Sequence, residues 1–82
     1  MSAFHYVYTL ESQSVRRELY TGQTSDLHRR LAEHNAGKVS HTSRFRPWSI
    51  RCTTAFRDRD RAIAFERYLK SGSGRAFLHR HL

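Results

Sequence analysis

The hydrophobic positions of the chain fall into short runs that predict three β-strands. Residues 4–10 are apolar, aromatic and β-branched, which is typical of a strand. Residues 15–23 have a similar composition and follow a polar connection at residues 11–14. Two such runs joined by a short connection predict an antiparallel hairpin. Residues 48–56, again rich in β-branched and aromatic side chains, predict a third strand.

The polar positions between the second and third runs carry the signals of a helix and a loop. Thr24 or Ser25 can cap a helix, because a side-chain oxygen there accepts a hydrogen bond from a free backbone N–H. This helix is expected to run to about Asn35, with Gly37 as its terminator. Residues 38–47 are polar and basic, and they predict a loop.

Residues 59–70 predict a second helix, with Asp58 as its cap. The Ser and Gly residues at 71–74 are expected to break this helix, and residues 75–82 predict a last short one. The order of elements is therefore β-β-α-β-α-α. It predicts an α/β fold in which a small three-stranded sheet with an antiparallel hairpin is flanked by helices.

Polar residues occupy positions on the first predicted helix that should face the core. At about 100° per residue, Leu27 and Leu31 are the apolar anchors. Arg30 and His34 share the stripe with these leucines. A histidine at such a position is either a hydrogen-bonded residue at the edge of the core or a functional group.

The second predicted helix repeats this pattern. Ala62, Phe65 and Leu69 form its apolar stripe, and Glu66 lies within it. Burying an unpaired carboxylate costs several kcal/mol, so Glu66 needs a cation nearby. That cation is either an arginine, which would make the pair structural, or a metal ion.

The predicted strands contribute tyrosine hydroxyls. Tyr6 and Tyr8 are two residues apart and therefore point to one face of the first strand. Tyr20 lies near the end of the second, and an antiparallel hairpin can bring Tyr8 and Tyr20 together. The alternative is that each ring packs in the core with its hydroxyl at the rim.

Size and charge narrow the class of protein. A chain of 82 residues makes one domain, residues 1–82, with a thin core. Its 15 Lys and Arg against 7 Asp and Glu give a net charge of +8, and 13 of those 15 are Arg. The guanidinium fork of Arg matches phosphate geometry. This charge favours nucleic acid as the partner, with an anionic membrane surface or a merely basic protein as alternatives.

The cysteine count and the absence of long apolar stretches indicate a cytoplasmic protein. Cys52 is the only cysteine, so neither an intrachain disulfide nor a Cys-x-x-Cys zinc pair can form. Both facts suit a reducing compartment. The N-terminal residues lack the features of a signal peptide, and no apolar stretch approaches the roughly 20 residues of a membrane span.

Two short motifs near the start of the chain resemble those of the GIY-YIG nuclease superfamily. Tyr-Val-Tyr at residues 6–8 stands where this family has Gly-Ile-Tyr, and Tyr-Thr-Gly at residues 20–22 stands where it has Tyr-Ile-Gly. Their spacing suits the family's opening hairpin. Tyr6 replaces the first glycine, while the last tyrosine of the motif, Tyr8, is kept.

Two later segments extend the resemblance over nearly the whole chain. Residues 22–35 are similar to the helix that carries the family's catalytic arginine, here Arg30, followed by a recurring histidine, here His34. Residues 65–70 are similar to the helix that carries the metal-binding glutamate, here Glu66. The chain looks most like the small bacterial members that stand alone.

The resemblance implies that the protein cuts DNA with the help of one divalent ion. Glu66 would be the single protein ligand of Mg²⁺ or Mn²⁺, which accept a carboxylate, waters and phosphate oxygens. Arg30 would donate to the non-bridging phosphate oxygens. Tyr8 would be the general base, and because its ordinary pKa is near 10, it needs positive charge nearby or a proton acceptor such as His34. Tyr20 would orient the water or Tyr8.

Basic side chains in and beyond the central loop are candidates for contacts with flanking phosphates. Such contacts give affinity without sequence preference. Phe45 and Trp48 either stack on unpaired bases or pack in the core. Lys70, one turn after Glu66, either touches phosphate or lies on the surface. The candidates for phosphate contacts are Lys38, His41, Arg44, Arg46 and Lys70.

Three hypotheses follow for the function. The first is a metal-dependent endonuclease acting on DNA, with single-stranded or branched DNA as the leading substrate, because so small a domain has no room for a targeting module. The second is a non-catalytic nucleic-acid-binding module with this fold. It is favoured by the absence of the Asn that many family nucleases have after the glutamate helix, since Asn35 is the only Asn in the chain. The third is a basic protein whose polar residues serve stability or a protein partner.

Overall fold

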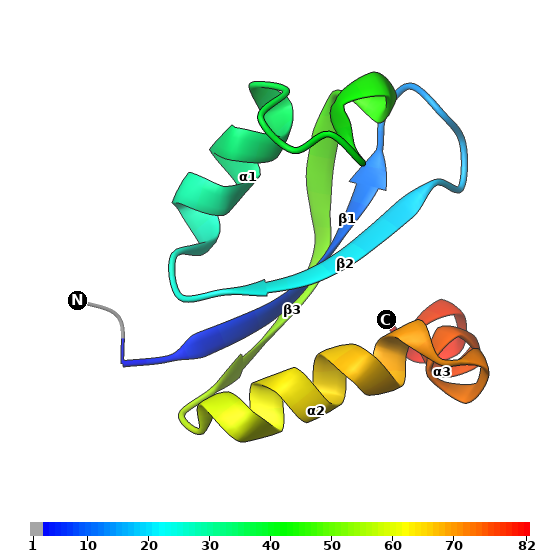
Figure 1. The fold of residues 1–82 in the computed structure, drawn as a ribbon. Coiled ribbons are helices and arrows are strands. Elements are labelled where there is room, and N and C mark those ends of the chain that lie inside the picture. The colour runs from blue at the N-terminus through cyan, green and yellow to red at the C-terminus, as the bar shows by residue number, and fades with distance from the viewer. Residues whose placement is uncertain (1–2) are drawn as a thin grey trace.

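A three-stranded antiparallel sheet forms the centre of the computed structural model, which describes residues 3–82. The strands are β1 (His5–Ser12), β2 (Leu19–Thr24) and β3 (Trp48–Phe56), in the spatial order β2-β1-β3. The first strand is therefore central and pairs antiparallel with both neighbours. This arrangement confirms the predicted hairpin and leaves β2 at one edge of the sheet (Figure 1).

Helices cover both faces of this sheet. Helix α1 (Leu27–Asn35) and a short 3-10 helix, η1 (Ser43–Phe45), lie on one side, and α2 (Arg59–Lys70) and α3 (Gly72–His81) lie on the other (Figure 1). The order β-β-α-β-α-α is the predicted one, and the predicted fold class is confirmed.

The two faces of the sheet bury different kinds of side chain. Because side chains alternate along β1, Val7 points to one face and packs with Leu69 of α2 and Leu78 of α3. Tyr8, the next residue, points to the α1 face, where it packs in a cluster with Trp48. Trp48 is only 4% exposed, and its indole N–H donates to the carbonyl of Thr42 at 2.9 Å, so of the two alternatives for this residue, packing in the core is confirmed.

Helix α1 starts later than its sequence suggests. Its cap is Asp26, whose side chain accepts a hydrogen bond from the backbone N–H of Arg29 at 3.1 Å. The hydroxyl of Thr24 instead accepts from the N–H of Asp26. The prediction of Thr24 or Ser25 as the cap was therefore wrong, because Thr24 stabilises the turn before the helix. The predicted cap of α2, Asp58, is confirmed.

The second strand begins at Leu19 rather than at residue 15. Residues 13–18 turn the chain, with Arg17 in the left-handed region at φ 67°. The hydroxyl of Ser12 accepts from the N–H of Val15, and the N–H of Ser12 donates to the carbonyl of Glu18. These bonds close a longer turn than the apolar pattern indicates.

Helix α3 begins at Gly72, three residues before the predicted start. Ser71 alone separates α2 from α3, and its hydroxyl accepts from the N–H of Gly74 at 3.2 Å. A Cβ atom at Gly74 would lie 1.6 Å from the carbonyl oxygen of Tyr68. This glycine therefore allows two helices to approach closely, rather than breaking one.

Candidate active site

Tyr8 owes its position to the glycine opposite it. In the β1–β2 pairing Tyr8 faces Gly22, and a Cβ atom at Gly22 would lie 2.6 Å from the Tyr8 hydroxyl oxygen. The ring of Tyr8 thus lies across Gly22, and its hydroxyl lies over the edge strand β2. The glycine of the Tyr-Thr-Gly motif is needed for this close approach.

Replacing Gly22 with alanine is expected to lower the free energy of unfolding by about 1–3 kcal/mol, because the new methyl group overlaps the Tyr8 hydroxyl. Urea unfolding followed by circular dichroism measures this change. Gly72→Ala is the matched control, since a Cβ atom there meets nothing within 4 Å. Equal destabilisation by the two substitutions would contradict the proposed role of Gly22.

The Tyr8 hydroxyl begins a chain of buried hydrogen bonds. Tyr8 Oη lies 3.0 Å from His34 Nε2, and His34 Nδ1 lies 2.8 Å from Thr42 Oγ1. The Thr42 hydroxyl in turn donates to the carbonyl of Val39 at 3.3 Å. Because Thr42 gives its only proton to that carbonyl, it accepts from His34 Nδ1–H. His34 Nε2 is then the acceptor for the Tyr8 hydroxyl.

Burial keeps both members of the Tyr8–His34 pair neutral. Burial raises the pKa of Tyr8 above its ordinary value, although the Arg30 guanidinium acts in the opposite direction. Burial also lowers the pKa of His34, and the positive charge of Arg30 lowers it further. His34, with no exposed surface, is therefore a neutral imidazole with an accepting nitrogen turned toward Tyr8.

The pKa shift of His34 makes stability depend on pH. Its folded-state pKa lies below the unfolded value of about 6.5, so the unfolded chain binds the proton more readily. The contribution to stability is present above that pH and is lost as pH falls through the lower folded pKa. Urea unfolding between pH 7.5 and 5 is expected to show this loss, with a slope of at most about 1.4 kcal/mol per pH unit. His34→Gln should flatten the slope, and an unchanged slope would contradict this origin.

Arg30 is held at the rim of the site by its own helix. Its Nη1 donates to Glu33 Oε1 at 2.9 Å, and its side chain remains 35% exposed. The guanidinium also lowers the pKa of the Glu33 carboxyl. Glu33 thus orients Arg30 while leaving part of the guanidinium open to solvent. The spacing of Arg30 and Glu33, three residues apart on one helix, is a signal in the sequence for this ion pair.

Glu66 approaches the same region from α2. Its side chain is 18% exposed, and one carboxylate oxygen accepts a hydrogen bond from Lys70 Nζ at 3.0 Å. The partner in the structure is therefore a lysine one turn away, rather than the arginine that was one of the two alternatives. The negative charge of Glu66 contributes to the raised pKa of Tyr8, which places the two groups within electrostatic reach.

Tyr20 completes the group of aromatic residues over β2. Its ring centroid lies 4.9 Å from that of His34 and 6.3 Å from that of Tyr8. The structure thus brings Tyr8, Tyr20, Arg30 and His34 together on the α1 face. Thr42, which ends the hydrogen-bond chain, was missed by sequence reasoning because nothing in its neighbourhood sets it apart from other loop threonines.

The basic residues of the central loop lie apart from the tyrosines, beyond the end of α1. Arg44 places its guanidinium 5.3 Å from the ring centroid of Phe45, which itself packs on Trp48. Arg46 donates to the carbonyl of Ser43. All four basic side chains of this loop, namely Lys38, His41, Arg44 and Arg46, are exposed.

Asn35 has a structural role at the end of α1. Its amide accepts from the backbone N–H of Trp48 at 2.6 Å and donates to the carbonyl of the same residue at 3.0 Å. These two bonds fix the end of α1 to the start of β3. Asn35 therefore does not take the place of the asparagine that many GIY-YIG nucleases, which the sequence resembles, have after the glutamate helix.

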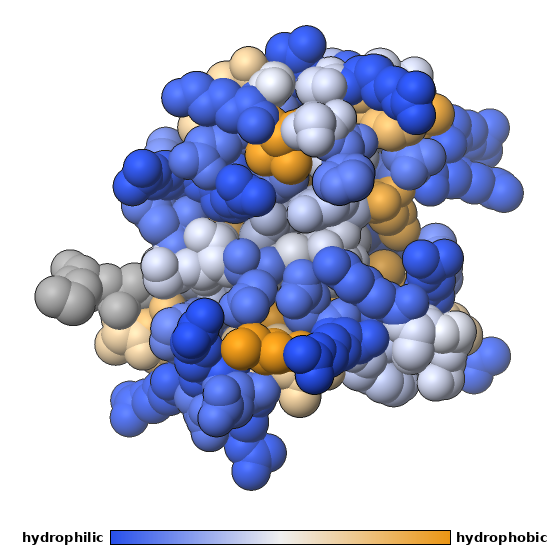
Figure 2. All heavy atoms as spheres, viewed as in Figure 1, coloured by the Kyte–Doolittle hydropathy of each residue, from blue (hydrophilic) through white to orange (hydrophobic). Residues whose placement is uncertain are grey.

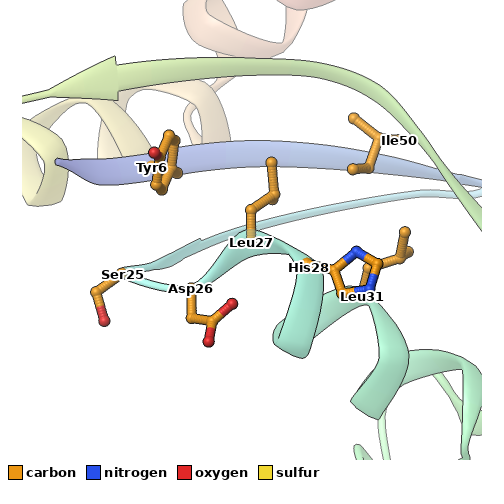
Figure 3. A pocket seen from close by; sticks show the side chains of 7 residues that line it. All are labelled: Tyr6, Ser25, Asp26, Leu27, His28, Leu31 and Ile50. Carbon is orange, nitrogen blue, oxygen red and sulfur yellow. The ribbon is translucent and has the colours of Figure 1, made fainter. Parts of the chain in front are cut away.

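A larger hollow lies on the α1 face but away from the tyrosine cluster. It has a volume of about 730 Å³, and its lining includes Leu27, Leu31 and Ile50 (Figure 3). Its titratable groups are Tyr6 on β1 and Asp26 and His28 at the start of α1 (Figure 3). Neither Arg30 nor His34 lines it. The chemistry of the candidate site therefore resides at the β2 edge rather than in this hollow.

The side chains that could ligate a metal suit a hard divalent ion that needs few protein ligands. In residues 3–82 no group of three or more His, Cys, Asp or Glu side chains is arranged to hold a metal. Glu66 offers a partly exposed carboxylate whose present partner is a long, half-exposed lysine side chain. Mg²⁺ commonly takes one or two carboxylates and completes its shell with water and phosphate oxygens. The residues present fit such an ion and do not fit an all-protein cage.

The fold and these residues agree with one class of protein. The family model described as the GIY-YIG catalytic domain matches residues 4–78, so the chain belongs to the GIY-YIG family. This is a family of nucleases, which act on DNA and generally use divalent metal ions. In residues 3–82 no helix is both long enough and apolar enough to cross a membrane.

The chain is also similar to curated proteins from bacteria and archaea. It is 40% identical over 72 residues to "UPF0213 protein SpyM3_1077" of Streptococcus pyogenes serotype M3, covering 87% of this chain and 76% of that protein. It is 39% identical over 72 residues to "UPF0213 protein HQ_3675A" of Haloquadratum walsbyi, covering 87% and 79%. Neither name states an activity.

Proposed function

We propose that this protein is a metal-dependent endonuclease that hydrolyses phosphodiester bonds in single-stranded or branched DNA. The observation that carries the proposal is the buried chain from Tyr8 through His34 to Thr42, which lies beside Arg30 and within reach of the charge of Glu66. A chain of this kind is costly to bury, and its middle member is a neutral imidazole that can accept a proton.

The chain moves the proton that the attacking water must lose. As the water oxygen bonds to phosphorus, its proton passes to the Tyr8 oxygen while the Tyr8 proton passes to His34 Nε2. The raised pKa of Tyr8 makes a free tyrosinate unfavourable, so transfer to His34 is the better route. Thr42 fixes the His34 tautomer that can accept this proton. Because His34 has no exposed surface, the proton leaves by the same path in reverse: the imidazolium returns a proton to the Tyr8 oxygen while the Tyr8 hydroxyl releases one to solvent.

The other side chains act on the phosphate. Arg30, with part of its guanidinium exposed, would donate to the non-bridging oxygens on which negative charge accumulates. Glu66 would hold a Mg²⁺ or Mn²⁺ ion, which supplies Lewis acidity to the phosphate and to the leaving 3′-oxygen. Lys70 would exchange its bond with Glu66 for contact with a phosphate oxygen. The bond from phosphorus to the 3′-oxygen breaks, and the product carries a 5′-phosphate.

The test compares one DNA sequence presented as single strand, duplex and branched junction. Each is incubated with the protein in Mg²⁺, in Mn²⁺ and in EDTA. We expect cutting of the single strand and the junction with either metal, slower cutting of the duplex, and none in EDTA. Preferential cutting of duplex would contradict the substrate preference. Binding without cutting in every condition would contradict the enzyme and support the non-catalytic binding module.

A further inference from the structure

A second polar hollow opens next to Tyr20, on the side of β2 that faces α2 and α3. Its volume is about 390 Å³, which falls in the range of about 300–1,000 Å³ that is usual for ligand sites. Leucines form part of its lining. We call it the basic groove, and its polar lining consists of Arg17, Glu18, Tyr20, Thr21, Lys70, Arg75 and His79.

The two arginines of this groove have no acidic partner among the residues that the structure describes. Arg17 and Arg75 are exposed, and within residues 3–82 neither side chain forms an ion pair with a carboxylate. Glu18 is the one acidic side chain in the lining. Lys70 is paired with Glu66, so the net positive charge of the groove comes from two unpaired guanidinium groups beside one carboxylate, which suits an anionic ligand.

Arg17 reaches the groove from a conformation that arginine rarely adopts. Its φ of 67° lies in the left-handed region, where the Cβ atom of an L-residue is crowded and glycine is not. A residue that keeps such a conformation at the wall of a polar groove points to a role for its side chain. This observation is independent of the charge of the groove.

The groove is connected to the candidate active site through two residues. Tyr20 lines it and also contacts His34, while Lys70 lines it and bonds to Glu66. The basic loop at residues 38–46 lies on the opposite side of the sheet from α3 (Figure 1). Figure 2 shows residues of intermediate hydropathy, drawn in white and pale blue, across the centre of this face, with strongly hydrophilic residues above and below them.

We propose that the basic groove binds phosphate groups of the substrate strand on one side of the cut, with Arg17 and Arg75 as the main contacts. The inference rests on the proposed function for the identity of the ligand as a nucleic-acid strand. The strand would pass from the tyrosine cluster along the edge of β2 toward α3. His79 and Lys70 would add weaker contacts.

The test is a binding measurement that removes two groove charges and compares them with two matched charges elsewhere. Arg17→Gly/Arg75→Gln is the groove variant, and Arg59→Gln/Arg61→Gln at the start of α2 is the control. Both lose two positive charges. Fluorescence anisotropy with a single-stranded oligonucleotide in EDTA gives Kd over a range of salt concentrations without cutting.

The groove variant is expected to bind about tenfold more weakly at low salt than wild type, with the control nearly unchanged. Its slope of log Kd against log salt should fall by about 1.4, because each single-strand phosphate contact contributes about 0.7. Arg17→Gly relieves the left-handed backbone, so the melting temperature should not fall. Equal weakening by the two double variants, or no weakening by the groove variant, would overturn the proposal.

The outcomes separate this inference from the proposed function. Wild-type protein that binds DNA with the expected difference between variants, but never cuts it, refutes the enzyme and supports the groove. Wild-type protein that cuts DNA while the groove variant behaves like the control refutes the groove alone.

Discussion

Replacing Glu66 with glutamine is expected to slow metal-dependent DNA cutting by about 10³-fold. Glutamine keeps the size of the side chain and can still meet Lys70, but it lacks the charge that holds a hard divalent ion. Such an ion supplies several kcal/mol of transition-state stabilisation, and each 1.36 kcal/mol corresponds to about a tenfold change in rate. Single-turnover cutting of labelled DNA at saturating Mg²⁺ measures the loss.

The matched control for this substitution is Glu11→Gln. Glu11 is a surface carboxylate paired with Arg51 at 3.6 Å, and neither residue belongs to the candidate site. The control is expected to cut within about twofold of wild type, since a surface pair contributes little. Retention of cutting by Glu66→Gln at the wild-type rate would refute the assignment of the metal ligand. DNA binding in EDTA should be unchanged or slightly tighter for Glu66→Gln, because a negative charge is removed.

Much of the fold was readable because it depends on local patterns. The alternation of Val7 and Tyr8 across the two faces of β1 follows from the two-residue period of a strand. The cap of α2 at Asp58 follows from the preference of an N-terminus for a short side-chain acceptor. Arg30, His34 and Glu66 were recognisable because they interrupt apolar stripes.

The features that the sequence did not settle depend on contacts between different segments of the chain, which local patterns do not show. Glycine at position 74 reads as a helix breaker, yet it lies inside α3 because the backbone of Tyr68 leaves no room for a side chain. Two interpretations of Trp48 stayed open in the sequence because it lies next to basic residues, and its indole N–H bond to the carbonyl of Thr42 shows that it packs in the core. The role of Thr42 depends on the loop folding back over His34, so the sequence alone did not indicate it.

The division of labour between the two tyrosines follows from the same folded loop. Tyr8 is 1% exposed and bonded to His34, so its hydroxyl is connected to an acceptor. In the part of the chain that the structure describes, the hydroxyl of Tyr20 has no hydrogen-bond partner, and Tyr20 also lines the basic groove. For the proposed mechanism, this difference favours proton transfer by Tyr8 and substrate positioning by Tyr20.

Tyr8→Phe is therefore expected to slow cutting by about 10²–10⁴-fold, the usual contribution of a positioned acid–base group. It should also lower the free energy of unfolding by about 1–3 kcal/mol, because His34 Nε2 loses its partner in a buried site. Tyr20→Phe should slow cutting far less and leave stability within about 0.5 kcal/mol of wild type. Single-turnover rates and urea unfolding on the same preparations measure both effects.

A double substitution tests whether Tyr8 and His34 act as one unit. If the proton passes from Tyr8 to His34, removing either residue breaks the same route, and Tyr8→Phe/His34→Gln should cut no more slowly than the slower single variant. Multiplicative losses in the double variant would show two independent roles and would refute the relay. A larger loss for Tyr20→Phe than for Tyr8→Phe would transfer the role of base to Tyr20, whose ring also contacts His34. The relay thus predicts both the order of the single variants and the absence of further loss in the double.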